Sequence, residues 1–380
     1  MSKNKKLVPK RRFKEFQNSD AWEQRELGEV VQITMGQSPL GSNYTENPSD
    51  YILVQGNADM KNGKVFPRIW TTQVTKTAEP DDIILSVRAP VGDVGKTDYN
   101  VVLGRGVAGI KGNEFIYQLL SKMKSNSYWG KYSTGSTFDS INSNDLKEAN
   151  ICIPSTNEQV QIGSFFRNLD QTIAFQQRKL EKMKAMKSAY LSEMFPAEGE
   201  RKPKRRFPGF TDDWEQRELG NYVSITTGKL DANAMKEDGE YDFFTSGIQK
   251  YKIDVPAFEG PAITIAGNGA TVGYMHYADG MFNAYQRTYV LTDFLVDRHF
   301  IFQMIGRTLP KKISQEARTG NIPYIVMDML SELKVSLPSI KEQTKIGVFF
   351  YNLDQTIAFQ QQKLEKLQNI KKAYLNEMFI

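Results

Sequence analysis

Three short segments have residue types and spacings close to those of nucleotide-binding or methyl-transfer motifs. The segment G-D-V-G-K-T at 92–97 resembles a phosphate-binding loop, but Pro90 stands where such a loop requires its first glycine. The segment G-N-G-A-T-V-G at 267–273 is one residue longer than the dinucleotide-binding fingerprint, and no clear helical pattern follows it. The segment N-I-P-Y at 321–324 has Ile322 where amino-group methyltransferases carry proline, and no cofactor-binding glycine loop accompanies it. Because each motif is incomplete, the sequence predicts no catalytic and no cofactor-binding site in this chain.

Metal and thiol chemistry are limited by the residue inventory. Cys152 is the single cysteine, and His276 and His299 are the two histidines. Disulfide frameworks, cysteine-rich zinc sites and paired-histidine metal sites cannot be assembled from these residues. Cys152 lies in the apolar, strand-like run I-C-I-P, so we expect an inert buried thiol rather than a nucleophile.

Polar and aromatic side chains near turns fit a different chemistry, the reading of DNA bases. Arginine pairs bidentately with guanine, asparagine or glutamine pairs with adenine, and lysine contacts phosphate. For any single residue the alternative is an ordinary solvated side chain. The candidates in the first half are Arg88, Arg105, Lys122, Lys124, Tyr128, Lys131, Tyr132, Thr134, Ser136 and Thr137. The candidates in the second half are Lys250, Asn268, Gln286, Arg287, Arg307, Lys311, Lys312, Arg318, Thr319, Asn321 and Tyr324.

The elements that must position these residues follow from an internal repeat. Residues 153–195 and 337–379 are identical at 29 of 43 positions at a constant offset of 184. A second repeated block opens each half, with R-R-F followed by W-E-Q-R-E-L-G at 11–28 and again at 205–220. Between these blocks the two halves diverge almost completely. The chain therefore alternates variable bodies with near-identical helical segments.

The repeated segment has the period of a long helix with a heptad seam. Pro154 and Pro338 precede the two copies, and Pro196 follows the first. We expect helices of about 35 to 38 residues, on the order of 50 Å long. The seam of the first copy is Ile162, Phe166, Leu169, Ile173, Gln176, Leu180, Met183, Lys187, Tyr190 and Met194. The seam of the second copy is Ile346, Phe350, Leu353, Ile357, Gln360, Leu364, Leu367, Lys371, Tyr374 and Met378.

Polar residues at equivalent seam positions favour an antiparallel pairing of the two helices. Polar groups in a seam reduce stability but fix register. Antiparallel pairing places Gln176 against Leu364, Leu180 against Gln360, and Leu169 against Lys371, so that each layer joins one seam position to its complement. We therefore predict an antiparallel intrachain coiled coil with pseudo-two-fold symmetry. The alternative is two surface helices, each packed on its own body.

The variable bodies have patterns of short strands and turns. Strand-like runs occupy 51–57, 82–95 and 101–110 in the first body and 241–247, 262–273 and 285–291 in the second. A short helix is expected around 114–126 and around 295–308. The fold class is therefore α+β, with two bodies of irregular mixed sheet and short helices. The predicted boundaries are 1–21 (basic segment), 22–153 (first body), 154–196 (first long helix), 197–213 (basic linker), 214–337 (second body) and 338–380 (second long helix).

Length and composition are consistent with this plan. The chain has 380 residues, 40% of them hydrophobic, and a formal net charge of +5. About 100 to 200 residues per domain suggests several domains, and this apolar content excludes disorder throughout. No apolar run could span a membrane, and the lysine-rich start lacks the apolar run of a leader peptide. We expect a cytoplasmic protein without a membrane partner, and the charge permits binding to nucleic acid.

The whole pattern resembles the specificity subunit of type I restriction-modification systems. The resemblance rests on W-E-Q-R-E-L-G at Trp22 and Trp214, R-F-P-G-F at 206–210, V-R-A-P-V-G at 87–92, T-G-N-I-P-Y at 319–324, and the duplicated N-L-D-Q-T-I-A helix. It covers essentially the whole chain. The first lead reads R-F-K-E-F instead of R-F-P-G-F, so the turn there is expected to differ.

The resemblance implies a non-catalytic subunit of a bacterial defence complex. In such proteins two target-recognition domains each read one half of a split site in double-stranded DNA. The subunit docks two modification subunits, which methylate adenine with S-adenosylmethionine, and up to two restriction subunits, which use ATP and Mg²⁺ to translocate and cut DNA. If the helices space the two half-sites, inserting one or two turns within 176–186 lengthens the gap between them. Exchanging residues 29–150 then alters one half-site alone.

Two other classes of protein compete with this interpretation. A stand-alone DNA-modifying enzyme would transfer methyl groups without a partner. A coiled-coil scaffold without DNA contact would show no salt-dependent DNA binding, because phosphate contacts release counterions. The bases of the target cannot be read from the sequence.

Overall fold

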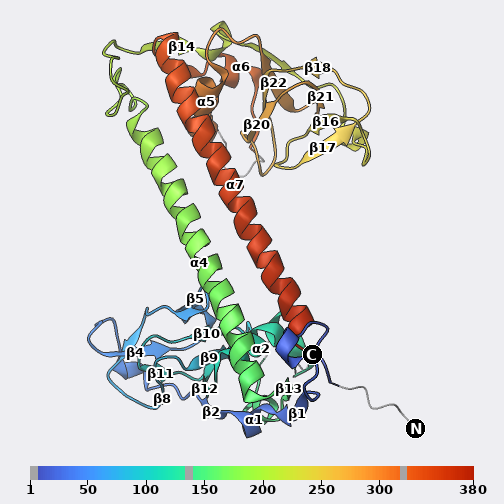
Figure 1. The fold of residues 1–380 in the computed structure, drawn as a ribbon. Helices are drawn as coiled ribbons and strands as arrows, with labels where there is room; N and C mark the ends of the chain where they lie inside the picture. Colours follow the sequence, from blue (N-terminus) through green and yellow to red (C-terminus); the bar gives the residue numbers. More distant parts are fainter. Residues whose placement is uncertain (1–6, 133–139, 317–322) are drawn as a thin grey trace. The chain divides into compact units, whose positions relative to one another are not determined.

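The computed structural model describes residues 7–132, 140–316 and 323–380. They form two compact units, unit 1 from Met1–Gln177 with Lys363–Ile380, and unit 2 from Arg178–Gln362. The long helices α4 (Thr156–Glu193) and α7 (Ile340–Met378) each contribute one part to unit 1 and the other part to unit 2 (Figure 1). The units thus combine segments that lie far apart in the sequence.

Unit 1 contains two larger sheets whose central strands are apolar and buried. All residues of β9 and β11 are buried, and the strands lie in the interior of their sheets. One sheet has the order β2 (Gln32–Met35), β12 (Val107–Lys111), β9 (Ile83–Ser86), β10 (Val94–Lys96), β6 (Lys64–Val65) and β5 (Met60–Lys61). The other has the order β3 (Tyr44–Thr45), β7 (Trp70–Thr71), β4 (Tyr51–Val54), β11 (Val101–Leu103) and β8 (Lys76–Ala78). A separate pair joins β1 (Glu23–Glu26) to β13 (Asn150–Ile153).

Short helices cover part of the unit 1 sheets. Helix α2 (Glu114–Ser125) begins where the Asn113 side chain accepts a hydrogen bond from the Ile116 amide, and it buries Phe115 and Leu120 in the core. The other helical segments are α1 (Leu27–Val30), α3 (Ser143–Lys147), η1 (Lys14–Phe16), η2 (Gly41–Asn43), η3 (Asn57–Asp59) and η4 (Tyr128–Tyr132).

Unit 2 has the same arrangement of sheets and helices as unit 1, but its two larger sheets contain fewer strands. One sheet has the order β15 (Ser224–Thr227), β22 (Thr288–Thr292), β19 (Ala262–Ala266) and β20 (Met275–Ala278). The other has the order β17 (Lys250–Ile253), β16 (Tyr241–Phe244), β21 (Met281–Ala284) and β18 (Phe258–Glu259). Strand β14 (Glu215–Glu218) pairs with β23 (Lys334–Leu337). The helical segments are α5 (Arg298–Glu316), α6 (Met327–Ser331), η5 (Leu219–Asn221) and η6 (Ala232–Ala234).

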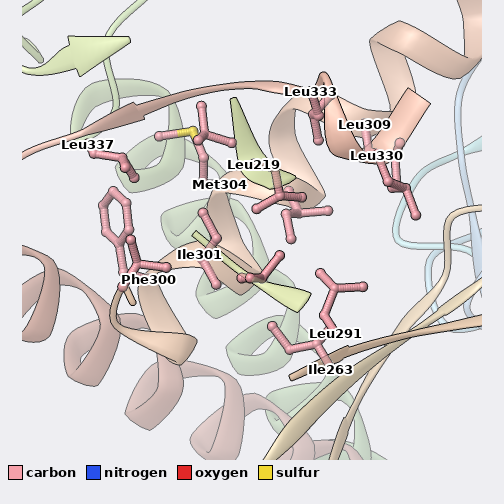
Figure 2. Close-up of a cluster of buried hydrophobic side chains, with 14 of the residues drawn as sticks. Leu219, Ile263, Leu291, Phe300, Ile301, Met304, Leu309, Leu330, Leu333 and Leu337 are labelled. Atoms are coloured by element: carbon pink, nitrogen blue, oxygen red, sulfur yellow. The ribbon is translucent and has the colours of Figure 1, made fainter. Parts of the chain in front are cut away.

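The hydrophobic core of unit 2 is formed between its first sheet and α5. Ile263 and Leu291 of the sheet face Phe300, Ile301 and Met304 of the helix, and all five side chains are buried (Figure 2). Burial of such apolar side chains is the main source of stability in a domain of this size. The predicted α+β class is confirmed in both units. Helix α2 is close to the expected 114–126, whereas α5 continues beyond the expected 308 to Glu316.

Within each unit the two long helices pair in antiparallel fashion. In unit 1, Lys371 of α7 donates to Asp170 of α4 at 2.5 Å, and the Phe165 and Tyr374 rings lie 5.2 Å apart. In unit 2 the equivalent pairs are Lys187 with Asp354, at 2.5 Å, and Tyr190 with Phe349, at 5.2 Å. These contacts confirm the antiparallel pairing expected from the seam. Every seam position named above is buried or half-buried in both helices.

The far ends of the long helices complete the aromatic cores. In unit 1, Phe379 stacks on Phe115 at 5.0 Å and meets the edge of Trp22 at 6.3 Å. In unit 2, Phe195, which follows α4, stacks on Phe300 at 5.5 Å and meets Trp214 at 5.9 Å. Each core therefore depends on a phenylalanine beyond the end of a long helix.

Candidate nucleic-acid interface

In unit 1, loops from several strands meet at one edge, which we call the loop edge of unit 1 (36–38, 55–56, 87–92, 104–106 and 140–141). The Val87 amide donates to the Gly106 carbonyl, and the Ile141 amide donates to the Val87 carbonyl, both at 2.9 Å. Arg88 forms an isolated β-bridge with Ser140. A Cβ at Gly106 would lie 2.0 Å from the Gln55 carbonyl oxygen, so the close approach of these two loops requires glycine there.

The loop edge of unit 2 (228–230, 246–250, 267–273, 285–287 and 324–325) is built in the same way. The Gly267 amide donates to the Arg287 carbonyl at 2.8 Å, and the Ile325 amide donates to the Gly267 carbonyl at 2.7 Å. Asn268 forms an isolated β-bridge with Tyr324. The same backbone hydrogen bonds thus occur at both loop edges, although the loop sequences differ.

These connections define equivalent positions in the two units. Arg88 and Asn268 are each the second residue after a central strand, and each forms an isolated β-bridge, Arg88 with Ser140 and Asn268 with Tyr324. Arg105 precedes Gly106, whose carbonyl accepts from the Val87 amide just after β9. Gln286 precedes Arg287, whose carbonyl accepts from the Gly267 amide just after β19. Arg88, Arg105 and Gln286 are exposed, and Asn268 is half-buried.

The charge and shape of the two loop edges differ. Unit 1 presents the Arg88 and Arg105 guanidinium groups, which make no hydrogen bond or ion pair with residues that the structure describes. Unit 2 presents Arg287 together with the exposed apolar side chains Ile248 and Tyr324, each 59% exposed. Exposed cations attract phosphate, and exposed aromatic side chains can contact bases.

One histidine supports the loop edge of unit 2. His276 of β20 lies with its Nε2 3.2 Å from the Gly247 carbonyl oxygen, and its ring contacts those of Phe244 and Tyr274. Burial lowers the pKa of His276 below its usual range. With its proton on Nε2, the neutral ring donates to the Gly247 carbonyl and holds the turn between β16 and β17.

Two of the candidate cations lie at helix ends instead of at the loop edges. The Lys122 ammonium, whose side chain is buried, donates to the Ile380 carbonyl at 2.9 Å, and burial lowers its pKa. Arg307 occupies the equivalent place in unit 2 and donates to the carbonyls of Leu191 and Pro196. Cations at these carbonyls compensate the negative end of the helix dipole. They have a structural role in the two units.

The remaining cationic candidates have partners within their own units. Lys124 pairs with Asp93, Lys312 pairs with Glu316 at 2.6 Å, and Lys311 lies 3.7 Å from Glu198. The Lys131 ammonium lies 3.7 Å from the centre of the Tyr128 ring. Lys250 lies 3.6 Å from Asp242 at the start of β17, beside the loop edge. Tyr132 ends η4, and Thr134, Ser136, Thr137, Arg318, Thr319 and Asn321 lie outside the described residues.

Sequence reasoning missed the polar residues that share the loop edges. Ser38 accepts a hydrogen bond from the Arg105 amide at 3.1 Å, and Ser246 donates to the Asn268 side chain at 2.6 Å. Gln55 donates to the Tyr44 hydroxyl at 2.7 Å. The signal that could have found Gln55 is its place in a Gln-Gly turn directly after the apolar strand β4.

Two of the incomplete motifs lie within the described residues and have no catalytic geometry, and the third, at 321–324, lies partly outside them. Val94–Lys96 of the first motif is strand β10, and Lys96 donates to Glu114 at 2.7 Å. The glycines at 267–273 precede strand β20 instead of a helix. Across residues 7–132, 140–316 and 323–380, no group of three or more His, Cys, Asp or Glu side chains is arranged to hold a metal ion. Cys152, expected to be buried, is half-buried, and this burial raises its pKa.

The paired helices carry an identical exposed patch in each unit. The ten residues 168–177 are repeated without change at 352–361, and their outward positions include Phe175 and Phe359, which are 57% and 67% exposed. Exposed positions elsewhere on the same helices differ, for example Ser164 and Val348. Because exposed side chains do not contribute to core packing, the internal fold does not require this identity.

None of the helices in the described parts of the chain has the length and apolar character to cross a membrane.

Comparisons with known proteins identify a family for most of the chain. Residues 19–185 and 211–369 match the model of the type I restriction modification DNA specificity domain. The chain is 38% identical over 162 residues to the type I restriction enzyme EcoDI specificity subunit of Escherichia coli, a match that covers 43% of this chain and 36% of that protein. It is 20% identical over 297 residues to the MjaVIII specificity subunit of Methanocaldococcus jannaschii, covering 69% of this chain and 68% of that protein.

A solved structure has the same fold. The S subunit of a type-I restriction-modification system from M. genitalium covers 98% of this chain and 99% of its own length with a TM-score of 0.75, at 19% identity.

Proposed function

Because the chain belongs to the type I restriction modification DNA specificity family, we propose that it reads a bipartite DNA target, one half-site with each unit. The observation that carries the proposal is the pairing of a repeated framework with two different loop edges. Equivalent backbone hydrogen bonds hold Arg88 in unit 1 and Asn268 in unit 2, although the loops have different sequences. A common framework with different reading residues is what two unlike half-sites require.

The proposal also includes docking of two identical methyltransferase subunits. Two copies of one partner need two copies of one surface, and the repeated patches around Phe175 and Phe359 meet this need. An exposed aromatic side chain with polar neighbours is typical of the anchors that dominate protein interfaces. Gln171 and Thr172 of the first patch recur as Gln355 and Thr356 in the second, so one partner surface fits both.

The chain itself is proposed to contribute recognition and assembly, without catalysis. The methylation of adenine with S-adenosylmethionine belongs to the docked methyltransferases in this proposal. Cleavage that depends on ATP and Mg²⁺ belongs to up to two restriction subunits. The specificity unit then determines where on the DNA these partners act.

The test is to sequence modified adenines in cells that carry this chain and its partner methyltransferase. We expect modification at one split sequence, and exchange of residues 29–150 for another such body should change one half of it. A matched exchange within 229–320 should change the other half. Modified adenines without a common sequence, or changes in both halves after one exchange, would contradict the proposal.

A scaffold without DNA contact is separated from this function by a binding measurement. The complex should bind DNA with an affinity that falls as salt rises, because cationic groups at the loop edges release counterions from phosphate. Binding without this dependence, or no binding, would favour the scaffold.

A further inference from the structure

We propose that the two units differ in the base that they prefer, with Arg88 of unit 1 directed to guanine and Asn268 of unit 2 directed to adenine. This inference rests on the proposed reading of DNA and extends it to the bases of each half-site. The alternative is that both residues contact phosphate or solvent and do not discriminate between bases.

Arg88 and Asn268 occupy equivalent backbone positions in the two units. Arg88 follows β9 and Asn268 follows β19, and each of these strands lies between its two partners in the matching sheet. The residue before each one donates its amide to the carbonyl of Gly106 or Arg287 and accepts from the amide of Ile141 or Ile325. Because four backbone hydrogen bonds fix these positions, the two units present different side chains from one backbone location.

The loop that carries Arg88 is restrained further along the chain. The Gly92 amide donates to the Ser86 carbonyl at 2.8 Å, and Gly92 has a φ of 85°. A Cβ at Gly92 would lie 2.3 Å from Trp129, so the loop closes against this ring only with glycine. The Ser86 hydroxyl donates to the Arg88 carbonyl at 2.9 Å. A restrained loop limits where the exposed guanidinium can reach.

The side chain of Asn268 is oriented by a neighbour. The Ser246 hydroxyl donates to the Asn268 Oδ1 at 2.6 Å. An amide oxygen has two lone pairs, so Oδ1 keeps one for the N6 amino group of adenine, and the Nδ2 group remains for N7. Arginine at the equivalent place in unit 1 has donors only, which match O6 and N7 of guanine.

A second pair of equivalent positions has the same difference. Arg105 of unit 1 corresponds to Gln286 of unit 2, and both are exposed. Glutamine has the same bidentate match to adenine as asparagine, and arginine again matches guanine. Two independent positions therefore favour guanine for unit 1 and adenine for unit 2. Arg287 of unit 2 carries a positive charge, whereas the equivalent residue of unit 1, Gly106, has no side chain.

The experiment selects duplexes from a pool randomised at the target, using the full chain in complex with its partner methyltransferase. Wild-type selection first defines the two half-sites. Arg88→Ala is expected to lower the preference for guanine at one position of one half-site by about 5- to 150-fold, the range of one lost bidentate contact. Asn268→Ala is expected to do the same for adenine in the other half-site. Ser246→Ala should weaken that adenine preference less than Asn268→Ala does.

Matched controls are available on exposed side chains away from the loop edges. Arg25→Ala on β1 and Asn221→Ala in η5 should leave every preferred base unchanged. Thermal unfolding of each variant in the complex verifies that Arg88→Ala and Asn268→Ala remain folded.

Three results would overturn the inference, and they differ from failure of the proposed function. Arg88→Ala could weaken binding to all sequences equally, which indicates a phosphate contact. It could change a base other than guanine, or it could change nothing. If wild-type selection yields no preferred sequence at all, the proposed reading of DNA fails together with the inference.

Discussion

Lys371 of α7 lies 2.5 Å from Asp170 of α4, and the same carboxylate accepts a hydrogen bond at 2.7 Å from the buried Gln118 of α2. Unit 2 repeats this arrangement with Lys187 and Gln303 on Asp354. One carboxylate therefore joins the paired helices to the helix that packs on the sheet. The hydrogen bond from Gln118 should contribute more to stability than the ion pair with Lys371, because Gln118 is buried and Lys371 is half-exposed.

We expect Asp170→Ala to destabilise unit 1 by about 1 to 3 kcal/mol, since it leaves one of the two N–H groups of the buried Gln118 amide unsatisfied, while the other still donates to Glu114 at 3.1 Å. Lys371→Met should cost at most about 1 kcal/mol, the usual value for a partly exposed ion pair. Urea unfolding of the full chain measures both changes. Asp354→Ala should cause a comparable loss in unit 2, and equal losses for Asp170→Ala and Lys371→Met would contradict this ranking.

The buried ion pair between Arg12 and Glu158 predicts a larger loss. Both nitrogen-oxygen distances are 2.7 Å, and the side chains are 6% and 0% exposed. Arg12→Met leaves an unpaired buried carboxylate and should cost about 3 to 5 kcal/mol. The neighbouring Arg11→Met removes an exposed pair with Glu377 and should cost far less than Arg12→Met. Denaturant midpoints compare the two variants, and similar midpoints would refute the difference.

The repeated exposed patch predicts the stoichiometry of the complex. Phe175→Ala should reduce the bound methyltransferase subunits from two to one, and the double variant with Phe359→Ala should bind none at the same concentration. Loss of an aromatic anchor typically costs about 2 kcal/mol or more of binding free energy. Native mass spectrometry counts the subunits. Phe66→Ala, at a similarly exposed phenylalanine on the first body, is the control that should leave two.

Acid should affect unit 2 more than unit 1, because both histidines of the chain lie in unit 2. Burial lowers the pKa of His276 and of His299. Below the ordinary pKa of about 6.5, the unfolded chain binds protons that the folded unit resists, so stability is lost as the pH falls through that value. The protection factors of amides in 262–305, which divide out the change of the intrinsic exchange rate with pH, should therefore fall between about pH 7.5 and pH 5.5.

His299→Phe tests the cause of this acid sensitivity. The His299 ring lies 4.3 Å from that of Tyr351 and 5.1 Å from that of Tyr277, a setting that accepts another aromatic ring. The variant should show a smaller loss of protection than the wild type. An unchanged loss of protection would assign the effect to groups other than His299.

The paired helices and the α+β bodies were predictable because they leave periodic signals. The seam from Ile162 to Met194 repeats every three and four residues, and burial follows that period. Sequence reasoning offered no reason for the positions at which the two copies differ, and the structure gives one for Arg167 and Tyr351. Arg167 lies 3.3 Å from Glu114 of the first body, whereas Tyr351 stacks near His299 of the second. The helices therefore pair with each other and also fit their own bodies.

The loop edges were less accessible to sequence reasoning. Arg88 and Asn268 were recognised as candidates by residue type, but their equivalence depends on the pairing of strands that are distant in sequence. Lys122 and Arg307 were chosen for their charge, yet both bind carbonyls at helix ends. Composition cannot distinguish a cation that faces solvent from one that is folded inward, since this depends on tertiary packing.

The contribution of residues 363–380 to unit 1 has a consequence for synthesis on the ribosome. All of unit 2 leaves the exit tunnel before Phe379 can reach Phe115 and Trp22. The first body therefore lacks one ring of its aromatic core until after the whole of unit 2 has been synthesised. Truncation before Phe379 should then destabilise the core of unit 1, which is translated first, more than the core of unit 2.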